Sequence, residues 1–258
     1  MDMEKLRKGG AITNFAADDA VETMLDEHFT KYQITPLEVS KNFSLYARRI
    51  LIKRFLAHYE LFRKTINLPG DIVELGVFRG SSLMSFANFL EIRNMGDRQK
   101  QVFGFDNFAG LTELSDKDGS ANEHFEKNEG GFNSSIFEDM LRDIVNIYDN
   151  DRFIPYKPRV KLIKGDVRET VPRFVKENPG LRISLIHFDI DLYEATKISL
   201  ECFYPLVVNG GVLLFDEYGI RPWEGESTAV DEYFKDKNVV LQKFDWAPNP
   251  GGFFIKNE

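Results

Sequence analysis

Short apolar runs alternate with longer stretches of helical pattern between residues 72 and 215. The apolar runs are Ile72–Val77, Val102–Phe105, Val160–Ile163, Ile183–Phe188 and Val212–Phe215. Such runs are typical of strands buried on both faces, as in parallel sheets. The stretches between them are long enough for the crossover helix that a parallel connection requires. The alternation therefore predicts an α/β protein with a doubly wound parallel sheet.

Two further apolar runs follow near the C-terminus, at Val239–Phe244 and Gly252–Ile255. The linker between them includes Ala247–Gly251 and is too short for a crossover helix, so we expect an antiparallel hairpin. The sheet would then be seven-stranded and mostly parallel. This arrangement resembles the Rossmann-like fold of class I methyltransferases.

Apolar residues recur at helical spacing from about Pro36 to Leu68 and end before Pro69-Gly70. They predict one or two amphipathic helices ahead of the sheet. We therefore expect residues 1–68 to form a helical cap or lid and residues 69–258 to form the core of the same domain. The helices would pack on this core or on a second subunit, which leaves a homo-oligomer open.

Charge and cysteine content exclude several classes of protein. With 33 Lys and Arg against 41 Asp and Glu, the chain has a formal net charge of −8. Nucleic acid is therefore not expected as the main partner, because neutralising phosphates needs clustered basic residues. A lone cysteine, Cys202, rules out an intramolecular disulfide framework and a multi-cysteine zinc site. Residues 1–15 lack the apolar stretch of a secretory signal, and no run of about 18 apolar residues occurs, so we expect a cytoplasmic protein without a membrane span.

An acid and two glycines lie where the first predicted strand turns into a helix. They are Glu74, Gly76 and Gly80, and Ser81 or Ser82 follows in a position to cap the helix. The Gly-x-Gly-x-x-Gly signature of dinucleotide binding is absent. Gly76 would let a ligand approach the backbone closely. Glu74 suits a cationic ligand, such as the ammonium group of the methionine part of S-adenosylmethionine.

Acids also end the second and third predicted strands. Asp106 could accept both hydroxyls of a ribose, and Asp166 could accept a hydrogen bond from an adenine amino group. Simpler roles remain open, since Glu74 would also suit a helix dipole and Asp166 would also suit an N-cap. Three acids at three consecutive strand ends favour the cofactor site.

Four more acids follow the fourth and fifth strands. Asp189 and Asp191 should point to the same side by alternation, and Asp216 and Glu217 follow the next strand. If these strands are neighbours, the carboxylates converge at one edge, which is unfavourable without a counter-ion. Oxygen ligands suit magnesium or another hard divalent cation.

We assign Asp191, Asp216 and Glu217 as the metal ligands of first choice, with Asp189 as the base for a hydroxyl that the metal activates. The opposite assignment of the two aspartates is open. In the simplest alternative the aspartates cap the next helix, and the other two acids lie in a solvated turn.

The chain resembles the macrocin O-methyltransferase family, the TylF and MycF type, from about Pro69 to Phe234. The matching stretches are Val73–Gly80, Phe103–Leu111, Phe188–Tyr193 and Gly210–Tyr218, extended by Ala229–Tyr233. The resemblance implies S-adenosylmethionine as cofactor, magnesium at the acids after strands four and five, and methylation of a sugar hydroxyl. It also implies that Asp191 and Asp216 are metal ligands. Glu217 stands where family members often carry aspartate.

We therefore expect an O-methyltransferase that acts on a nucleotide sugar or glycoside, in natural-product or surface-polysaccharide biosynthesis. The insert 116–133 diverges from the family, so the acceptor is not carried over. A phenolic or catechol acceptor would use the same chemistry, and a non-catalytic scaffold that binds the cofactor is a further alternative. A nicotinamide-dependent sugar oxidoreductase is disfavoured by the missing glycine signature.

Three side chains have open roles. His124 would contact a sugar or be solvated in the loop after the second strand. His187 would support the acids or belong to the core. Trp223 would pack against a sugar ring or anchor its own loop.

Overall fold

The computed structural model describes residues 16–257, and the side chains of residues 20–257 except residue 124. These residues belong to two compact units, and the boundary in the chain lies between Lys53 and Arg54. The second unit carries the sheet and all of the site residues predicted above.

The described part of the first unit is helical. It contains α2 (Ala16–Tyr32), α3 (Pro36–Lys41), α4 (Phe43–Tyr46) and the start of α5 (Arg49–Arg63). A capping box starts α3, since Thr35 Oγ1 accepts from the N–H of Glu38 at 3.3 Å and the Glu38 carboxylate accepts from the N–H of Thr35 at 2.8 Å. The prediction of one or two helices over residues 36–68 is wrong, because the helix breaks at Asn42 and again at Ala47. Neither position carries the glycine or proline that marks a break in a sequence.

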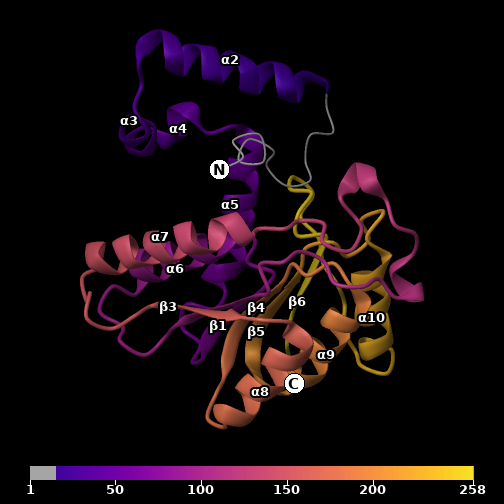
Figure 1. Cartoon of the computed structure of the whole chain (residues 1–258). Helices are drawn as coiled ribbons and strands as arrows, with labels where there is room; N and C mark the ends of the chain where they lie inside the picture. Colours follow the sequence, from indigo (N-terminus) through magenta and orange to yellow (C-terminus); the bar gives the residue numbers. More distant parts are fainter. Residues whose placement is uncertain (1–15, 258) are drawn as a thin grey trace. The chain divides into compact units, whose positions relative to one another are not determined.

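The second unit is built on a sheet of order β3-β2-β1-β4-β5-β6 (Figure 1). Its strands are β1 (Asp71–Leu75), β2 (Val102–Asp106), β3 (Val160–Lys164), β4 (Ile183–Phe188), β5 (Val207–Phe215) and β6 (Gly252–Ile255). β1 to β5 are parallel, and β6 is antiparallel to β5. The strand order reverses between β1 and β4, as in doubly wound folds. The predicted Rossmann-like α/β fold is confirmed.

The expected strand at residues 239–244 does not form. In this fully described stretch Gln242 makes one antiparallel bridge with Phe253, with N–H to carbonyl distances of 2.8 and 2.9 Å. The sheet therefore has six strands instead of seven, and its antiparallel pair is β5 with β6. Val239, Leu241 and Phe244 already pack against the core, so the apolar side chains of this stretch are covered without a longer ladder along β6.

Helices cover both faces of the sheet (Figure 1). They are α6 (Ser81–Arg93), α7 (Glu138–Asp151), α8 (Val167–Glu177), α9 (Tyr193–Phe203) and α10 (Glu224–Phe234). One core joins α8, α9 and α10 to Val73 and Leu75 of β1. The other core joins α6, Leu141 of α7 and the end of α5 to Ile72. Because side chains alternate along a strand, Glu74 lies on the α6 face with Ile72.

The loop between β2 and α7 is tied to the helices that follow β4 and β5. It contains the short helices η1 (Asp116–Asp118), η2 (Glu123–Phe125) and η3 (Ser135–Phe137), and η4 (Tyr204–Leu206) follows α9. Asp118 Oδ1 accepts from the N–H of Tyr193 at 2.7 Å. Lys127 is buried and donates to the carbonyls of Asp118 and Pro222, and to the Glu224 carboxylate at 3.0 Å. These contacts fix the loop beside the strand ends.

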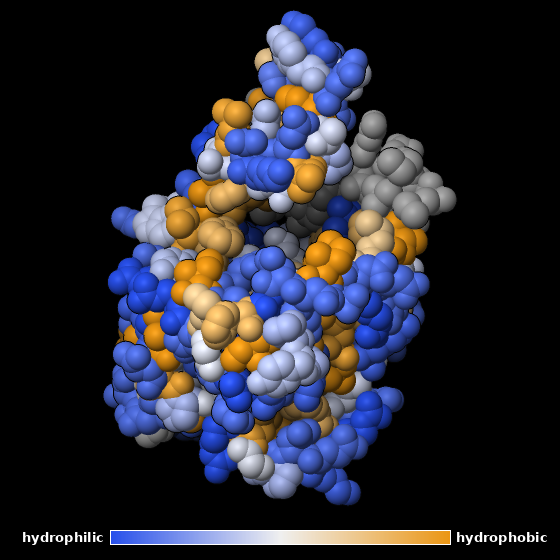
Figure 2. Space-filling model, turned by 90° about the vertical axis from the view of Figure 1, so that its left-hand side faces the viewer, coloured by the Kyte–Doolittle hydropathy of each residue, from blue (hydrophilic) through white to orange (hydrophobic). Residues whose placement is uncertain are grey.

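Large apolar side chains remain exposed on α6, on α7 and just after each of them. They are Ile92, Met95, Met140, Ile144, Ile147, Phe153 and Tyr156. Figure 2 shows apolar side chains distributed among polar ones over the face that it presents. Among the described residues, no helix has the length and apolar character needed to cross a membrane.

Candidate functional site

Acidic side chains gather where β4 and β5 end. The parallel ladder reaches the acids, since the N–H of Asp216 donates to the carbonyl of Phe188 at 2.9 Å. Carboxylate oxygens of Asp189, Asp191 and Glu217 lie within 4.8 Å of one another. We call Asp189, Asp191, Asp216 and Glu217 the acidic rim. The adjacency of β4 and β5 brings these four residues together, as the strand order predicts.

An arginine that the sequence analysis missed bridges two of the rim acids. Nη2 of Arg54 lies 2.6 Å from Oδ2 of Asp189, and Nη1 lies 3.0 Å from Oδ2 of Asp216. Arg54 precedes the buried residues Ala57, His58 and Leu61 at helical spacing, which places it on the inward side of α5. A charged residue at an inward position was the one signal in the sequence.

Asp216 is fully buried and has several partners besides Arg54. His187 Nε2 lies 3.3 Å from Oδ1, and Asn249 Nδ2 donates to Oδ2 at 3.1 Å. Burial alone would raise the pKa of Asp216, but the charge of Arg54 and the hydrogen bond from His187 hold that pKa well below its usual value. Asp216 is therefore ionised and strongly paired.

Behind His187 lies Glu74 of β1, its neighbour in register. His187 Nδ1 and Glu74 Oε1 are 3.6 Å apart, which is too long for a hydrogen bond but close enough for an ion pair. Burial alone would lower the pKa of His187, but Asp216 and Glu74 raise it to about 10. Burial raises the pKa of Glu74 to about 7. Glu74 Oε2 is buried without a hydrogen-bond partner among the described residues.

Negative charge exceeds positive charge at the rim. Burial and the repulsion of neighbouring carboxylates raise the pKa values of Asp191 and Glu217 well above their usual range. Glu226 adds a buried carboxylate, whose Oε1 accepts from the N–H of Glu217 at 2.8 Å. Asp191 also has a φ of +60°, a left-handed conformation that is strained for a non-glycine residue and common at functional sites. Clustered oxygens with too little positive charge fit a hard divalent cation.

The turn between β1 and α6 is shaped by its glycines. Gly76 has a φ of +83°, and a Cβ built there would lie 1.7 Å from the carbonyl oxygen of Asp189. Gly80 has a φ of +85° and is itself the N-cap of α6, with no side-chain cap. The expectation that Ser81 or Ser82 caps the helix is wrong, because the helix already begins at Ser81. Only glycine lets the turn lie against the backbone that carries the rim.

Asp106 joins the ends of β1 and β2. Its Oδ2 accepts from the N–H of Phe78 at 2.7 Å, and its Oδ1 accepts from the N–H of Phe108 at 2.6 Å. Phe78 and Phe108 have φ values of +51° and +57°. Burial raises the pKa of Asp106 above its usual value. Both oxygens therefore hold strained turns in place.

Asp166 is the N-cap of α8. Its Oδ1 accepts from the N–H of Arg168 at 2.8 Å, and its Oδ2 lies 2.6 Å from Nη2 of the same arginine. The capping role weighed against an adenine contact is therefore present in the structure. The adenine contact stays a prediction.

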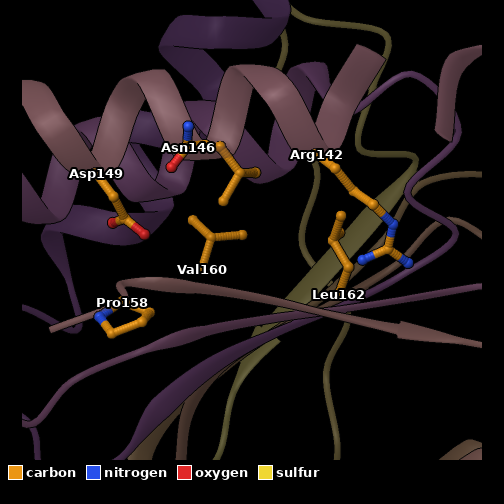
Figure 3. Close-up of a pocket in the computed structure, with 7 residues that line it drawn as sticks. Arg142, Asn146, Asp149, Pro158, Val160 and Leu162 are labelled. Carbon is orange, nitrogen blue, oxygen red and sulfur yellow. The ribbon is translucent and has the colours of Figure 1, made fainter. Parts of the chain in front are cut away.

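A separate cleft of about 310 Å³ lies between α7 and β3 (Figure 3). Its lining residues are Arg142, Val145, Asn146, Asp149, Pro158, Val160 and Leu162. None of the site residues predicted from the sequence lines this cleft. Its aspartate, Asp149, is paired with Arg152 at 2.9 Å. The cleft therefore lacks the convergent unpaired groups found at the rim.

The structure gives contacts for two of the three residues with open roles, His187 and Trp223. His187 supports Asp216 directly, as described above. Trp223 is buried and lies against Phe132, with ring centroids 5.8 Å apart, so it anchors the loop before α10. The side chain of His124 lies outside the described residues.

The chain is similar to curated O-methyltransferases over part of its length. The chain is 28% identical over 167 residues to demethyldecarbamoylnovobiocin O-methyltransferase of Streptomyces niveus, a match that covers 65% of this chain and 59% of that relative. The match thus spans less than two thirds of the curated relative's length.

Solved structures match over nearly the whole chain. Calicheamicin methyltransferase CalS11 superposes with a TM-score of 0.83 at 30% identity, and the match covers 96% of this chain and 97% of that chain. Its apo structure, described as a TDP-rhamnose 3′-O-methyltransferase of calicheamicin biosynthesis, gives a TM-score of 0.79 at 26% identity, with 95% and 96% covered. Residues 50–254 match the family model of macrocin-O-methyltransferase (TylF). With its fold, its strand-end acids and this match in agreement, the chain belongs to the macrocin-O-methyltransferase (TylF) family.

Proposed function

We propose that this protein is an S-adenosylmethionine-dependent and magnesium-dependent O-methyltransferase that acts on a sugar hydroxyl of a small molecule. The acidic rim carries the proposal, because three of its carboxylates approach within 4.8 Å in a chain of this family. The relatives are described as O-methyltransferases of demethyldecarbamoylnovobiocin and of TDP-rhamnose. A nucleotide sugar or a glycoside is therefore the acceptor class to test first.

S-adenosylmethionine would bind at the carboxyl ends of β1, β2 and β3. The residues that we propose for this site are Glu74, Gly76, Gly80, Ser81, Asp106 and Asp166. The buried and unpaired Oε2 of Glu74 supports the proposal, since an ammonium group or a bridging water would satisfy it. Asp106, at the end of β2, would accept hydrogen bonds from the two ribose hydroxyls.

A divalent cation, when bound, would supply Lewis-acid activation of the acceptor hydroxyl. We propose Asp191, Asp216 and Glu217 as its ligands and Asp189 as the base, with the exchange of Asp189 and Asp191 as the competing assignment. The base accepts the hydroxyl proton. S-adenosylmethionine, when bound, would supply the methyl group for the hydroxyl oxygen, and the products would be a methyl ether and S-adenosylhomocysteine.

Isothermal titration with S-adenosylmethionine and S-adenosylhomocysteine, in Mg²⁺ and again in EDTA, tests the cofactor. Binding of both justifies a screen of nucleotide sugars, glycosides and catechols, with product detected by mass spectrometry. No binding under either condition would contradict the proposal. Turnover that persists in EDTA would contradict the proposed dependence on magnesium.

The variants Asp189→Asn and Asp191→Asn separate a metal ligand from a base. Replacing the ligand weakens Mg²⁺ binding measured by titration. Replacing the base leaves Mg²⁺ binding intact and abolishes turnover. If both variants bind Mg²⁺ as the unmodified protein does and both turn over, neither assignment holds.

A further inference from the structure

The guanidinium of Arg54 lies between two acids of the rim and contacts each with a different nitrogen. The distances are 2.6 Å to Asp189 and 3.0 Å to Asp216. We infer that Arg54 is a built-in counter-ion of the rim, and that a divalent cation must displace its guanidinium from Oδ2 of Asp216 to bind that oxygen. This inference rests on the metal of the proposed function and names the residue that would set its affinity.

The location of Arg54 follows from the packing of α5. Ala57, His58 and Leu61 are buried on the same side of the helix. His58 stacks on Phe86 of α6, with ring centroids 5.2 Å apart. This packing holds the part of α5 that belongs to the second unit against the sheet. Arg54 therefore reaches the rim from a rigid helix and not from a loop.

No other lysine or arginine among the described residues pairs with Asp189 or Asp216. Asp189 has Arg54 as its ion-pair partner, and Asp216 has Arg54 and His187. The nearby Lys127 is committed to two carbonyls and to Glu224. Removal of Arg54 therefore leaves Asp189 without a paired cation in this part of the structure.

Arg54 and a divalent cation compete for the acidic rim because both are positively charged. A guanidinium and a divalent cation that contact the same oxygen of Asp216 repel each other strongly, because both are positively charged and only a few ångströms apart. The side chain of Arg54 is 31% exposed, so it has solvent on one side into which it can withdraw. The arginine thus stabilises the metal-free protein and weakens metal binding at the same time.

A merely structural arginine would behave in the opposite way. If Arg54 served to hold the acids in their metal-binding arrangement, its loss would weaken cation binding. The sign of the change therefore decides between a competitor and a support.

The test uses Arg54→Met and Arg54→Lys in the full-length chain, with Arg63→Met as the matched control. Arg63 lies on the same helix and is paired with Glu60 at 3.3 Å, away from the rim. Mn²⁺ binding is measured by isothermal titration and by the loss of free Mn²⁺ in electron paramagnetic resonance. We expect Arg54→Met to bind Mn²⁺ about 10- to 100-fold more tightly than the unmodified protein, the scale on which neighbours of metal ligands change affinity. The Mn²⁺ affinity of Arg54→Lys should lie between those of Arg54→Met and the unmodified protein. The Mn²⁺ affinity of Arg63→Met should equal that of the unmodified protein.

Thermal unfolding gives a second readout that needs no substrate. In EDTA, Arg54→Met should have a lower melting temperature than the unmodified protein. Mn²⁺ should raise the melting temperature of Arg54→Met by more than it raises that of the unmodified protein. Equal or weaker Mn²⁺ binding by both Arg54 variants would overturn the inference while the unmodified protein still binds the ion. Absence of Mn²⁺ binding in every variant would overturn the metal of the proposed function as well. If Arg54→Met does not fold, the Arg54→Lys titration decides alone.

Discussion

Two buried charged clusters lie at opposite edges of the same sheet and are built on opposite plans. The acidic rim follows the carboxyl ends of β4 and β5. At the amino ends of β2 and β3, Glu91, Asp149, Arg152 and Arg159 form a second cluster, which we call the amino-end network. Glu91 Oε2 lies 3.0 Å from Arg152 Nε and 3.2 Å from Arg159 Nη2.

The amino-end network is balanced in charge. Its two arginines face two acids, and several further N–H groups reach backbone carbonyls, such as Arg159 Nη1 to Lys100 at 2.8 Å and Arg152 Nη1 to Lys157 at 2.6 Å. The rim instead sets four carboxylates against Arg54 and His187. A balanced cluster needs no ligand to compensate its charges, whereas an excess of buried charge stays unfavourable until a ligand compensates it.

The largest expected effect comes from removing the charge of one acid of the rim. Glu217→Gln should lower methyl transfer on the order of 10³-fold, or about 4 kcal/mol in activation free energy, because a proposed metal ligand loses its charge. The free energy of unfolding should change by less than ~1 kcal/mol, because a mutually repelling carboxylate is lost. Turnover assays and urea unfolding measure the two quantities. Glu217→Asp is the control, and it should keep most activity because it retains the charge. Destabilisation by several kcal/mol would show that the rim, like the amino-end network, stabilises the fold.

The next largest effect should come from removing one arginine of the amino-end network. Arg159→Met should lower the free energy of unfolding by ~3 kcal/mol, because it leaves the partly buried Glu91 carboxylate and two backbone carbonyls with fewer hydrogen-bond partners. Turnover per folded molecule should be unchanged. Denaturant unfolding measures the loss, and Arg142→Met, which removes an exposed pair with Glu138 at 2.9 Å, should lose less than ~1 kcal/mol. Equal losses in both variants would show that the network is no more than surface charge.

A steric change at the rim should have an intermediate effect. Gly76→Ala places a Cβ against the carbonyl of Asp189 and should destabilise by more than ~2 kcal/mol. Gly130→Ala has a similar φ of +78° but meets nothing within 4 Å, so it isolates the conformational contribution of about 1 kcal/mol. Unfolding measurements that give the same loss for both would refute the close approach of the turn to the rim.

The smallest effect concerns an acid that lies at the carboxyl edge but is already paired. Asp166→Ala removes the N-cap of α8 and the pair with Arg168, and should lower the free energy of unfolding by ~1 kcal/mol. If Asp166 also binds adenine, the affinity for S-adenosylmethionine falls about tenfold, which is the size of one hydrogen bond. Titration of Asp166→Asn separates the two roles, because asparagine still caps a helix. Unchanged affinity in both variants would leave Asp166 with the cap alone.

The order of elements and the edge that carries the acids were predictable from the sequence. Apolar runs separated by helical stretches admit few arrangements, since parallel strands need crossovers and place all their carboxyl ends on one edge. Asp106, Asp166, Asp189 and Asp216 therefore lie at that edge whatever the details of packing. The strand expected at 239–244 was not predictable in the same way, because pairing along an edge strand depends on what its outer side buries.

Only the tertiary structure decided the partners of these acids. Arg54 meets Asp189 across 135 positions of sequence because α5 packs on the sheet, and no local pattern encodes that contact. In the same way, Gly76 is required by the backbone of Asp189, and Glu74 is buried beside His187 because β1 and β4 are neighbours. Local sequence sets which side chains follow each strand, since alternation and turn chemistry act over a few residues. Charge compensation and pKa depend on distances between segments, and packing alone sets those distances.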